Sequence, residues 1–253
     1  PALNWLIYYP VEKWLARYTD ILITINQEDY ERAQGFKAGK VCYVPGVGVD
    51  LKKFNTGCVN RTEKRAEIGV GQNDFALLSV GELIPRKNHE VVLRALSVLK
   101  QMGKLDGIKY VICGRGILET ELKHLTAELG LTEQVYFLGY RNDIPAICGS
   151  CDLFVFMSHQ EGLPVALMEA MACNLPVVCS AIRGNTDLIE DGVTGSIAEN
   201  TPESVAAAIC KMRENLGLRE RLRTAAQERV KGFELDVVKA KVKKIYEAAG
   251  VTE

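Results

Sequence analysis

The chain has 253 residues, of which 47% are hydrophobic and 25% are charged, and its formal net charge is −1. This composition is typical of a globular protein, and the length suits one large domain or one domain of ordinary size plus part of a second. A near-neutral charge gives no electrostatic case for nucleic-acid binding, which usually needs a basic domain. No apolar run approaches the roughly 18–20 residues that span a bilayer, so we expect neither a nucleic-acid partner nor a membrane-spanning segment.

The first 55 residues have a different pattern from the rest. "NWLIYYPVEKWLARYTD" predicts an aromatic helix that Pro10 kinks or restarts. "ILITI" and "VCYV" predict two strands around a helix capped by Asn26, and "PGVGVDLKKFN" predicts a glycine-rich connector. Two strands cannot bury the faces of a sheet alone. Because the sequence also starts at Pro1 without a methionine, we interpret residues 1–55 as the incomplete end of another domain in a fragment.

From residue 75 the chain alternates strands with helices. Apolar runs without polar alternation are typical of parallel strands buried on both faces. The helical patterns between them end at Gly103 and Gly130, which suit helix C-termini. This alternation predicts a doubly wound, Rossmann-like α/β domain over residues 56–235, with ligands beyond the C-terminal ends of the strands. The predicted strands are 75–80, 109–114, 135–139, 152–156 and 176–180, and the two helices are 88–103 and 117–130.

Helices alone are predicted after residue 200. Thr201 suits the N-cap and Pro202 the first helical position of the first one. Two more are expected near 218–231 and 236–249, and residues 236–253 are assigned as a C-terminal helix. The last helix carries Lys239, Lys241, Lys243 and Lys244. Contact with anionic lipid and a solvated basic face both fit this pattern, and the solvated face is favoured.

Eight cysteines lie mostly in apolar surroundings such as "YVICG" and "PVVCS", where a free thiol behaves as a small hydrophobe. This usage favours a reducing compartment, and therefore the cytoplasm, over a disulfide scaffold. "CGSC" (148–151) lacks both a thioredoxin-like strand-to-helix context and a second ligand pair, so we favour packing over redox or zinc chemistry. The eight are Cys42, Cys58, Cys113, Cys148, Cys151, Cys173, Cys179 and Cys210.

Two glutamates stand in the apolar run "SHQEGLPVALMEAMACNLPVVCS" (158–180). Pro164 suits the first position of a helix, whose open amides and positive dipole end would attract a phosphate. A carboxylate at Glu169 would be costly in an apolar helix without a partner, and it can accept hydrogen bonds from two sugar hydroxyls. We therefore predict that Glu161 and Glu169 hold hydroxyls on either side of a bound diphosphate. An equally weighted alternative pairs Glu169 with a core arginine and makes Glu161 an ordinary loop acid.

A second candidate group is "SVGELIPRKNHE" (79–90), directly after the first strand of the predicted domain. Arg86 and Lys87 in this loop can neutralise a diphosphate and stabilise charge on a leaving group. Taken alone, they fit a solvated loop pair equally well. "CGRG" (113–116) and "PGVG" (45–48) contain G-x-G without the rest of a dinucleotide fingerprint, so both are interpreted as turns.

Together these motifs resemble a known family. "EGLPVALMEAMACNLPVV" resembles the Glu-x7-Glu signature of the retaining family 4 glycosyltransferases with the GT-B fold, and "VGELIPRKNHEVVLRAL" is similar to their donor-phosphate loop. "VYFLGYRNDIPAICGSCDLFVFMS" and "IRGNTDLIEDGVTGSIAE" follow in the family's order and spacing. The resemblance covers about 75–235 as the nucleotide-sugar-binding C-terminal domain, and it makes 1–55 the tail of an N-terminal acceptor domain plus hinge.

The resemblance implies transfer of a sugar, with retention, from a UDP-sugar or GDP-sugar to an acceptor hydroxyl. The resemblance assigns three residues to catalysis: Glu161, Arg86 and Lys87. Glu161 would contact the donor sugar, and the two cations would contact the diphosphate. Glu169 would hold the ribose. The remaining donor-site residues would be the amides around Gly162, Leu163, Pro164 and Val165, the loop residues Tyr140, Arg141 and Ile144 beside the base, and His159, which is either a pocket residue or a bystander.

One departure from the family concerns Gly81, which Glu82 follows where arginine is common. Either Arg86 replaces that cation or Glu82 points away from the donor. No Asp-x-Asp motif is present, so no metal and no further cofactor are expected.

The family further implies surface polysaccharide or glycolipid synthesis. The acceptor would be a saccharide or a lipid-linked molecule at the inner membrane face, where the enzyme could make peripheral contact. Two alternatives remain at this stage. One is another GT-B enzyme, such as a nucleotide-sugar epimerase or a phosphorylase, and the other is a nucleotide-sugar-binding fragment without turnover.

Overall fold

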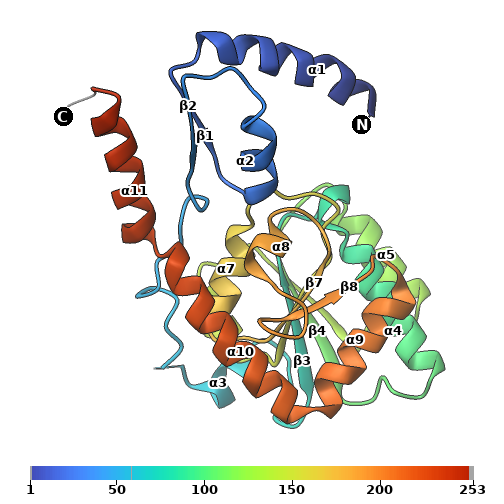
Figure 1. Cartoon of the computed structure of the whole chain (residues 1–253). Coiled ribbons are helices and arrows are strands. Elements are labelled where there is room, and N and C mark those ends of the chain that lie inside the picture. The colour runs from blue at the N-terminus through green and yellow to red at the C-terminus, as the bar shows by residue number, and fades with distance from the viewer. Residues whose placement is uncertain (1, 58, 251–253) are drawn as a thin grey trace. The chain divides into compact units, whose positions relative to one another are not determined.

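The computed structural model describes residues 2–57 and 59–250, with the backbone alone for 2–6. Cys58 therefore lies outside the described residues. The chain divides into two compact units: Pro1–Gly48 together with Gly232–Glu253, and Val49–Lys231. Their elements are labelled in Figure 1.

The first unit contains the two strands expected from "ILITI" and "VCYV". They pair in parallel, and Asn26 caps the helix between them by accepting a 2.8 Å hydrogen bond from the Asp29 amide. The N-terminal aromatic helix runs through Pro10 without a break in its assignment. The elements of this unit are α1 (Ala2–Leu15), β1 (Ile21–Thr24), α2 (Gln27–Ala33), β2 (Lys40–Tyr43) and α11 (Leu235–Ala248).

The second unit is built on a parallel sheet in the order β5-β4-β3-β6-β7-β8. The α/β fold predicted from the sequence is confirmed, and its five expected strands lie within one residue of their predicted bounds. The order reverses between β3 and β6, as in a Rossmann fold, so these strands flank the switch point where such sheets bind ligands. The strands are β3 (Phe75–Val80), β4 (Ile108–Cys113), β5 (Val135–Gly139), β6 (Leu153–Phe156), β7 (Val177–Ser180) and β8 (Ser196–Ala198).

Helices cover both faces of this sheet, with α4, α5 and α9 on one face and α7 and α10 on the other (Figure 1). The apolar side chains Val91, Val92, Ala95, Leu96 and Leu99 of α4 are buried, and Thr201 caps α9 by accepting from the Ser204 amide. Among the described residues, no helix is both long enough and apolar enough to cross a membrane. The helices are α3 (Arg61–Glu67), α4 (His89–Gln101), α5 (Glu119–Glu128), α6 (Ile144–Cys148), α7 (Val165–Ala172), α8 (Asn185–Leu188), α9 (Pro202–Glu214) and α10 (Leu216–Val230).

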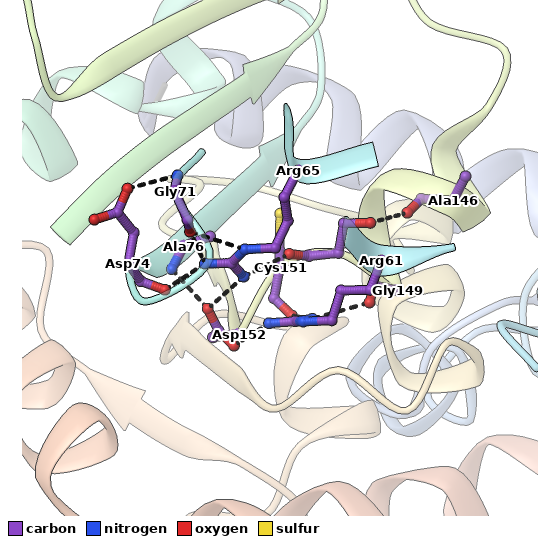
Figure 2. Close-up of polar contacts among 10 residues, drawn as sticks. Arg61, Arg65, Gly71, Asp74, Ala76, Ala146, Gly149, Cys151 and Asp152 are labelled. Carbon is purple, nitrogen blue, oxygen red and sulfur yellow. Dashed lines mark hydrogen bonds and ion pairs between the residues drawn. The ribbon is translucent and has the colours of Figure 1, made fainter. Parts of the chain in front are cut away.

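A buried arginine fastens the N-terminal ends of β3 and β6 (Figure 2). Arg65 is 1% exposed, and its guanidinium donates to the carbonyl oxygens of Gly71 and Ser150 at 2.8 and 2.9 Å. It also donates to Asp152 Oδ2 at 3.2 Å, and this carboxylate accepts the Ala76 amide at 2.8 Å. A buried guanidinium with these partners is satisfied, so Arg65 ties the N-terminal ends of β3 and β6 to the segment around Gly71.

Candidate functional site

The two sequence motifs meet at the switch point. The loop after β3 spans residues 81–88, with a short 3-10 turn at Pro85–Lys87, and the loop after β6 spans residues 157–164. Because β3 and β6 are parallel neighbours, their C-terminal ends bring both loops to the same edge of the sheet. Arg86 and Glu161, 75 positions apart, are in direct contact there.

Glu161 holds both predicted cations. Its Oε1 lies 2.7 Å from Lys87 Nζ and its Oε2 lies 3.1 Å from Arg86 Nη1. The carboxylate is buried, being only 6% exposed. The loops are further joined where Arg86 Nη1 donates to the Gln160 carbonyl at 3.0 Å and its own carbonyl accepts the His159 amide at 2.8 Å.

The two cations differ in exposure. The Lys87 side chain is 13% exposed, and its Nζ lies 5.0 Å from the centroid of the Phe156 ring, where the aromatic face stabilises its charge. The Arg86 side chain is 42% exposed. Two positive charges against the one negative charge of Glu161 leave one positive charge, so the cluster attracts an anion at the switch point.

Helix α7 follows directly, but its first residue is Val165. Pro164 occupies the N-cap, with φ −77° and ψ 117°, and its carbonyl accepts the Met168 amide at 3.3 Å. The prediction that Pro164 takes the first helical position is therefore wrong by one residue, because an extended ψ at this proline delays the helical turn. Gly162 is half-buried and Leu163 is buried beside it. The first amides of α7 lack intrahelical partners, as at any helix start, and such amides suit the binding of an anion.

Glu169 is the half-buried acid of α7. Its carboxylate makes no hydrogen bond or ion pair with any residue that the structure describes, so the alternative of a core arginine partner is not seen. Burial raises the pKa of Glu169, and the charge of Lys53 opposes this rise. A carboxylate without a protein partner in an apolar helix is available to accept hydrogen bonds from a ligand.

The site loops rest on glycines of the neighbouring loops, which sequence reasoning missed. A Cβ at Gly184 would lie 2.3 Å from the Gly162 carbonyl oxygen, and φ at Gly184 is +79°. A Cβ at Gly114 would lie 1.8 Å from the Gly81 carbonyl oxygen. "CGRG" was interpreted above only as a turn. Its Gly114 packs directly against the backbone of the loop 81–88, and any side chain at Gly114 would displace that loop.

His89 fastens the same loop and was also missed. Its Nε2 lies 3.2 Å from the carbonyl oxygen of Glu82, whose side chain is exposed. Burial lowers the pKa of His89 to about 4, so the imidazole is neutral at pH 7 and donates this hydrogen bond. A lone histidine between Asn88 and Glu90 carries no sequence pattern that would reveal such a role.

The loop after β5 presents Tyr140, which is 68% exposed, and leads to the half-buried Ile144 at the start of α6. Arg141 Nε donates to Asp143 Oδ1 at 2.7 Å, and its guanidinium also contacts Glu67. The hydrogen bond from Arg141 lowers the pKa of Asp143 well below its usual range. The Arg141 side chain is therefore held in an ionic cluster with Asp143 and Glu67.

The two cysteines of "CGSC" are free and buried. A hydrogen bond with Cys173 and, to a smaller extent, burial raise the pKa of Cys148. Burial also raises the pKa of Cys151. A raised pKa disfavours the thiolate that redox and metal chemistry require. Within residues 2–57 and 59–250, no group of three or more His, Cys, Asp or Glu side chains is arranged to hold a metal ion.

Comparison with known proteins supplies the family. Residues 60–229 match the family described as Glycosyl transferases group 1. The chain is 30% identical over 246 residues to an Escherichia coli UDP-Gal:alpha-D-GlcNAc-diphosphoundecaprenol alpha-1,3-galactosyltransferase, covering 95% of this chain and 63% of that protein. It is 34% identical over 197 residues to a Campylobacter jejuni N-acetylgalactosamine-N,N'-diacetylbacillosaminyl-diphospho-undecaprenol 4-alpha-N-acetylgalactosaminyltransferase, covering 77% and 50%.

Among solved structures, the chain resembles the Anabaena protein HepE in complex with UDP and glucose. The TM-score is 0.84 at 23% identity, over 94% of this chain and 66% of that one. This similarity shows the fold, which is that of GT-B glycosyltransferases. The chain spans between half and two thirds of the length of the curated relatives named above.

Proposed function

The chain belongs to the group 1 glycosyl transferases, and we propose that it binds the donor of a retaining, family 4 type hexosyltransferase. In this proposal the whole protein moves a sugar from a UDP-sugar to an acceptor hydroxyl. The observation that carries it is the contact of Glu161 with Arg86 and Lys87 at the switch point of the sheet, followed along the chain by Glu169, whose carboxylate has no partner among the described residues.

The proposed donor lies along the edge formed by the two site loops. Its diphosphate takes the cations Arg86 and Lys87 and the first amides of α7, because these groups supply positive charge and free N–H donors. Glu169 accepts the ribose hydroxyls. As the cations turn to the diphosphate, Glu161 is freed to accept hydroxyls of the donor sugar, and the loop from Tyr140 to Ile144 meets the base through its backbone.

The same groups account for catalysis. In the transfer the bond between the anomeric carbon and the diphosphate oxygen breaks, and the electron pair leaves with the diphosphate. Arg86, Lys87 and the α7 amides stabilise that charge as it develops, which is the electrostatic contribution that usually matters most. The acceptor oxygen bonds to the anomeric carbon on the face that the diphosphate leaves, and its hydroxyl proton passes to the departing diphosphate oxygen, so the configuration is retained. No metal is required in this scheme.

UDP is the proposed nucleotide and GDP the alternative. HepE, solved with UDP and glucose, supports UDP, and the relatives named for diphosphoundecaprenol-linked sugars support a saccharide or lipid-linked acceptor. We therefore place the protein in surface polysaccharide or glycolipid synthesis, in the cytoplasm, with peripheral contact at the inner membrane face.

A thermal-shift and calorimetry series with UDP, GDP and their sugars tests the proposal, because a ligand that binds the native state raises its stability. We expect UDP or GDP to bind this chain without transfer to an acceptor, since much of the relatives' length lies outside the matched region. Lys87→Met should weaken binding about tenfold or more by removing a charge-assisted contact. Failure of every nucleotide to bind, or full affinity in Lys87→Met, would contradict the proposal.

A further inference from the structure

A second, neutral link joins the two site loops. Asn88 Nδ2 donates to Asn200 Oδ1 at 3.2 Å, and Asn200 Nδ2 donates to the Ser158 carbonyl at 3.3 Å. Asn88 directly follows Lys87, and Ser158 lies three positions before Glu161. Asn200 follows β8, so a residue of a third loop bridges the loops that carry the cations and the acid.

Both anchors of this link are themselves held. The Ser158 carbonyl also accepts a 2.6 Å hydrogen bond from Ser180 Oγ, and Ser158 and Ser180 are buried. Asn88 has φ +51°, a left-handed conformation that asparagine tolerates better than most residues. Its side chain makes no capping bond to α4 and bonds Asn200 instead. The link therefore fixes the backbone immediately next to Lys87.

The two links respond differently to an anion. A diphosphate competes with Glu161 for Arg86 and Lys87, because all three interactions are ionic. The amide link carries no charge, and both the Oδ1 acceptor and the Nδ2 donor of Asn200 are already used in it. A phosphate therefore does not compete for this link as it competes for the two cations. It can hold the loops together during the exchange of partners at the cations.

We propose that Asn200 is a positioning residue, which keeps the Lys87 loop and the Glu161 loop in register while the donor takes over the cations. This inference rests on the proposed function and adds to it a residue outside the family motifs. Asn200 acts through Asn88 and Ser158 and does not touch the donor.

The test compares Asn200→Ala with Asn215→Ala. Asn215 caps α10 by accepting the Leu218 amide at 2.8 Å, so its loss also removes an asparagine hydrogen bond, but far along the chain from either site loop. Both variants should melt somewhat below the unchanged chain. Only Asn200→Ala should bind UDP about tenfold more weakly by calorimetry, because two hydrogen bonds that preorganise the site are lost.

Two further readouts separate positioning from general weakening. Asn88→Ala should lose UDP affinity to the same extent, and the double variant should lose little more, since both residues serve one link. Without any nucleotide, hydrogen exchange in Asn200→Ala should accelerate in residues 81–88 and 157–163, whereas Asn215→Ala should leave both segments unchanged.

Unchanged UDP affinity in Asn200→Ala, or additive losses in the double variant, would overturn the positioning role. Unchanged exchange in both loops would overturn the link itself. If the unchanged chain binds neither UDP nor GDP, the proposed function falls and with it the role toward the donor, whereas the exchange experiment reports on the link independently of any ligand.

Discussion

At the scale of single residues, two acids on one stretch of chain have opposite surroundings. Glu161 is buried against two cations, and Glu169 is half-buried with no protein partner among the described residues. The sequence showed that acids occur in an apolar run, but it could not show which one the protein itself neutralises. That depends on Arg86 and Lys87, which reach Glu161 only because β3 and β6 are neighbours.

Glu169→Gln should weaken UDP binding by roughly 1–3 kcal/mol, because a hydrogen bond to a charged acceptor is lost. The effect should depend on pH. Burial raises the pKa of Glu169, so the carboxylate takes up its proton at a higher pH than an exposed glutamate does. Calorimetry at decreasing pH should show affinity falling through that pKa, more steeply in the unchanged chain than in Glu169→Gln. Parallel curves for the two proteins would argue against a ribose role.

His89 predicts a pH dependence of stability. Its pKa falls from 6.5 in the unfolded chain to about 4 in the folded one, so between these values the unfolded chain binds more protons. Stability should therefore rise with pH across this window and be lost as the pH falls through it, by about 3 kcal/mol. Urea unfolding of His89→Gln, whose amide can still donate to the Glu82 carbonyl, should show a shallower slope from pH 6.5 to 4. An equal slope in both proteins would show that His89 does not cause this pH dependence.

At the scale of elements, the sequence predicted the strands of the larger sheet well because each is a short apolar run between turn signals. It missed β8, since Ser196–Ala198 is too short to show a pattern, and it placed the start of α7 one residue early. It also missed the loop supports at Gly114, Gly184 and His89. These residues act across neighbouring strands, and only the strand order brings them to the site.

Gly184→Ala and Gly192→Ala separate loop support from backbone strain. Both positions have positive φ, +79° and +71°, but a Cβ meets the Gly162 carbonyl at 2.3 Å only at Gly184. Gly192→Ala should lower the free energy of unfolding by roughly 1–2 kcal/mol, the cost of a left-handed alanine. Gly184→Ala should cost more in chemical denaturation and should also weaken UDP binding. Equal costs and equal UDP affinity would contradict the support of Gly162 by Gly184.

At the scale of the larger unit, the two ends of the sheet do different work. The buried Arg65 joins the N-terminal ends of β3 and β6 (Figure 2), and the C-terminal ends carry the ionic cluster of Glu161, Arg86 and Lys87.

Arg65→Met should reduce the free energy of unfolding by about 3–5 kcal/mol, because it leaves Asp152 and several carbonyls without their buried partner. Arg61→Met is the matched control, since Arg61 bonds the same carboxylate at 2.6 Å with a side chain that is 43% exposed. An exposed pair contributes about 1 kcal/mol or less. Similar losses for both variants in urea unfolding would contradict the central role of Arg65.

The proposed donor site is tested most directly by a crystal structure of this chain, determined from crystals soaked with UDP. We expect the diphosphate within hydrogen-bonding distance of Arg86 or Lys87 and the first amides of α7, with the ribose hydroxyls on Glu169. UDP bound away from the β3 and β6 loops, or a ribose that leaves Glu169 without a contact, would contradict it.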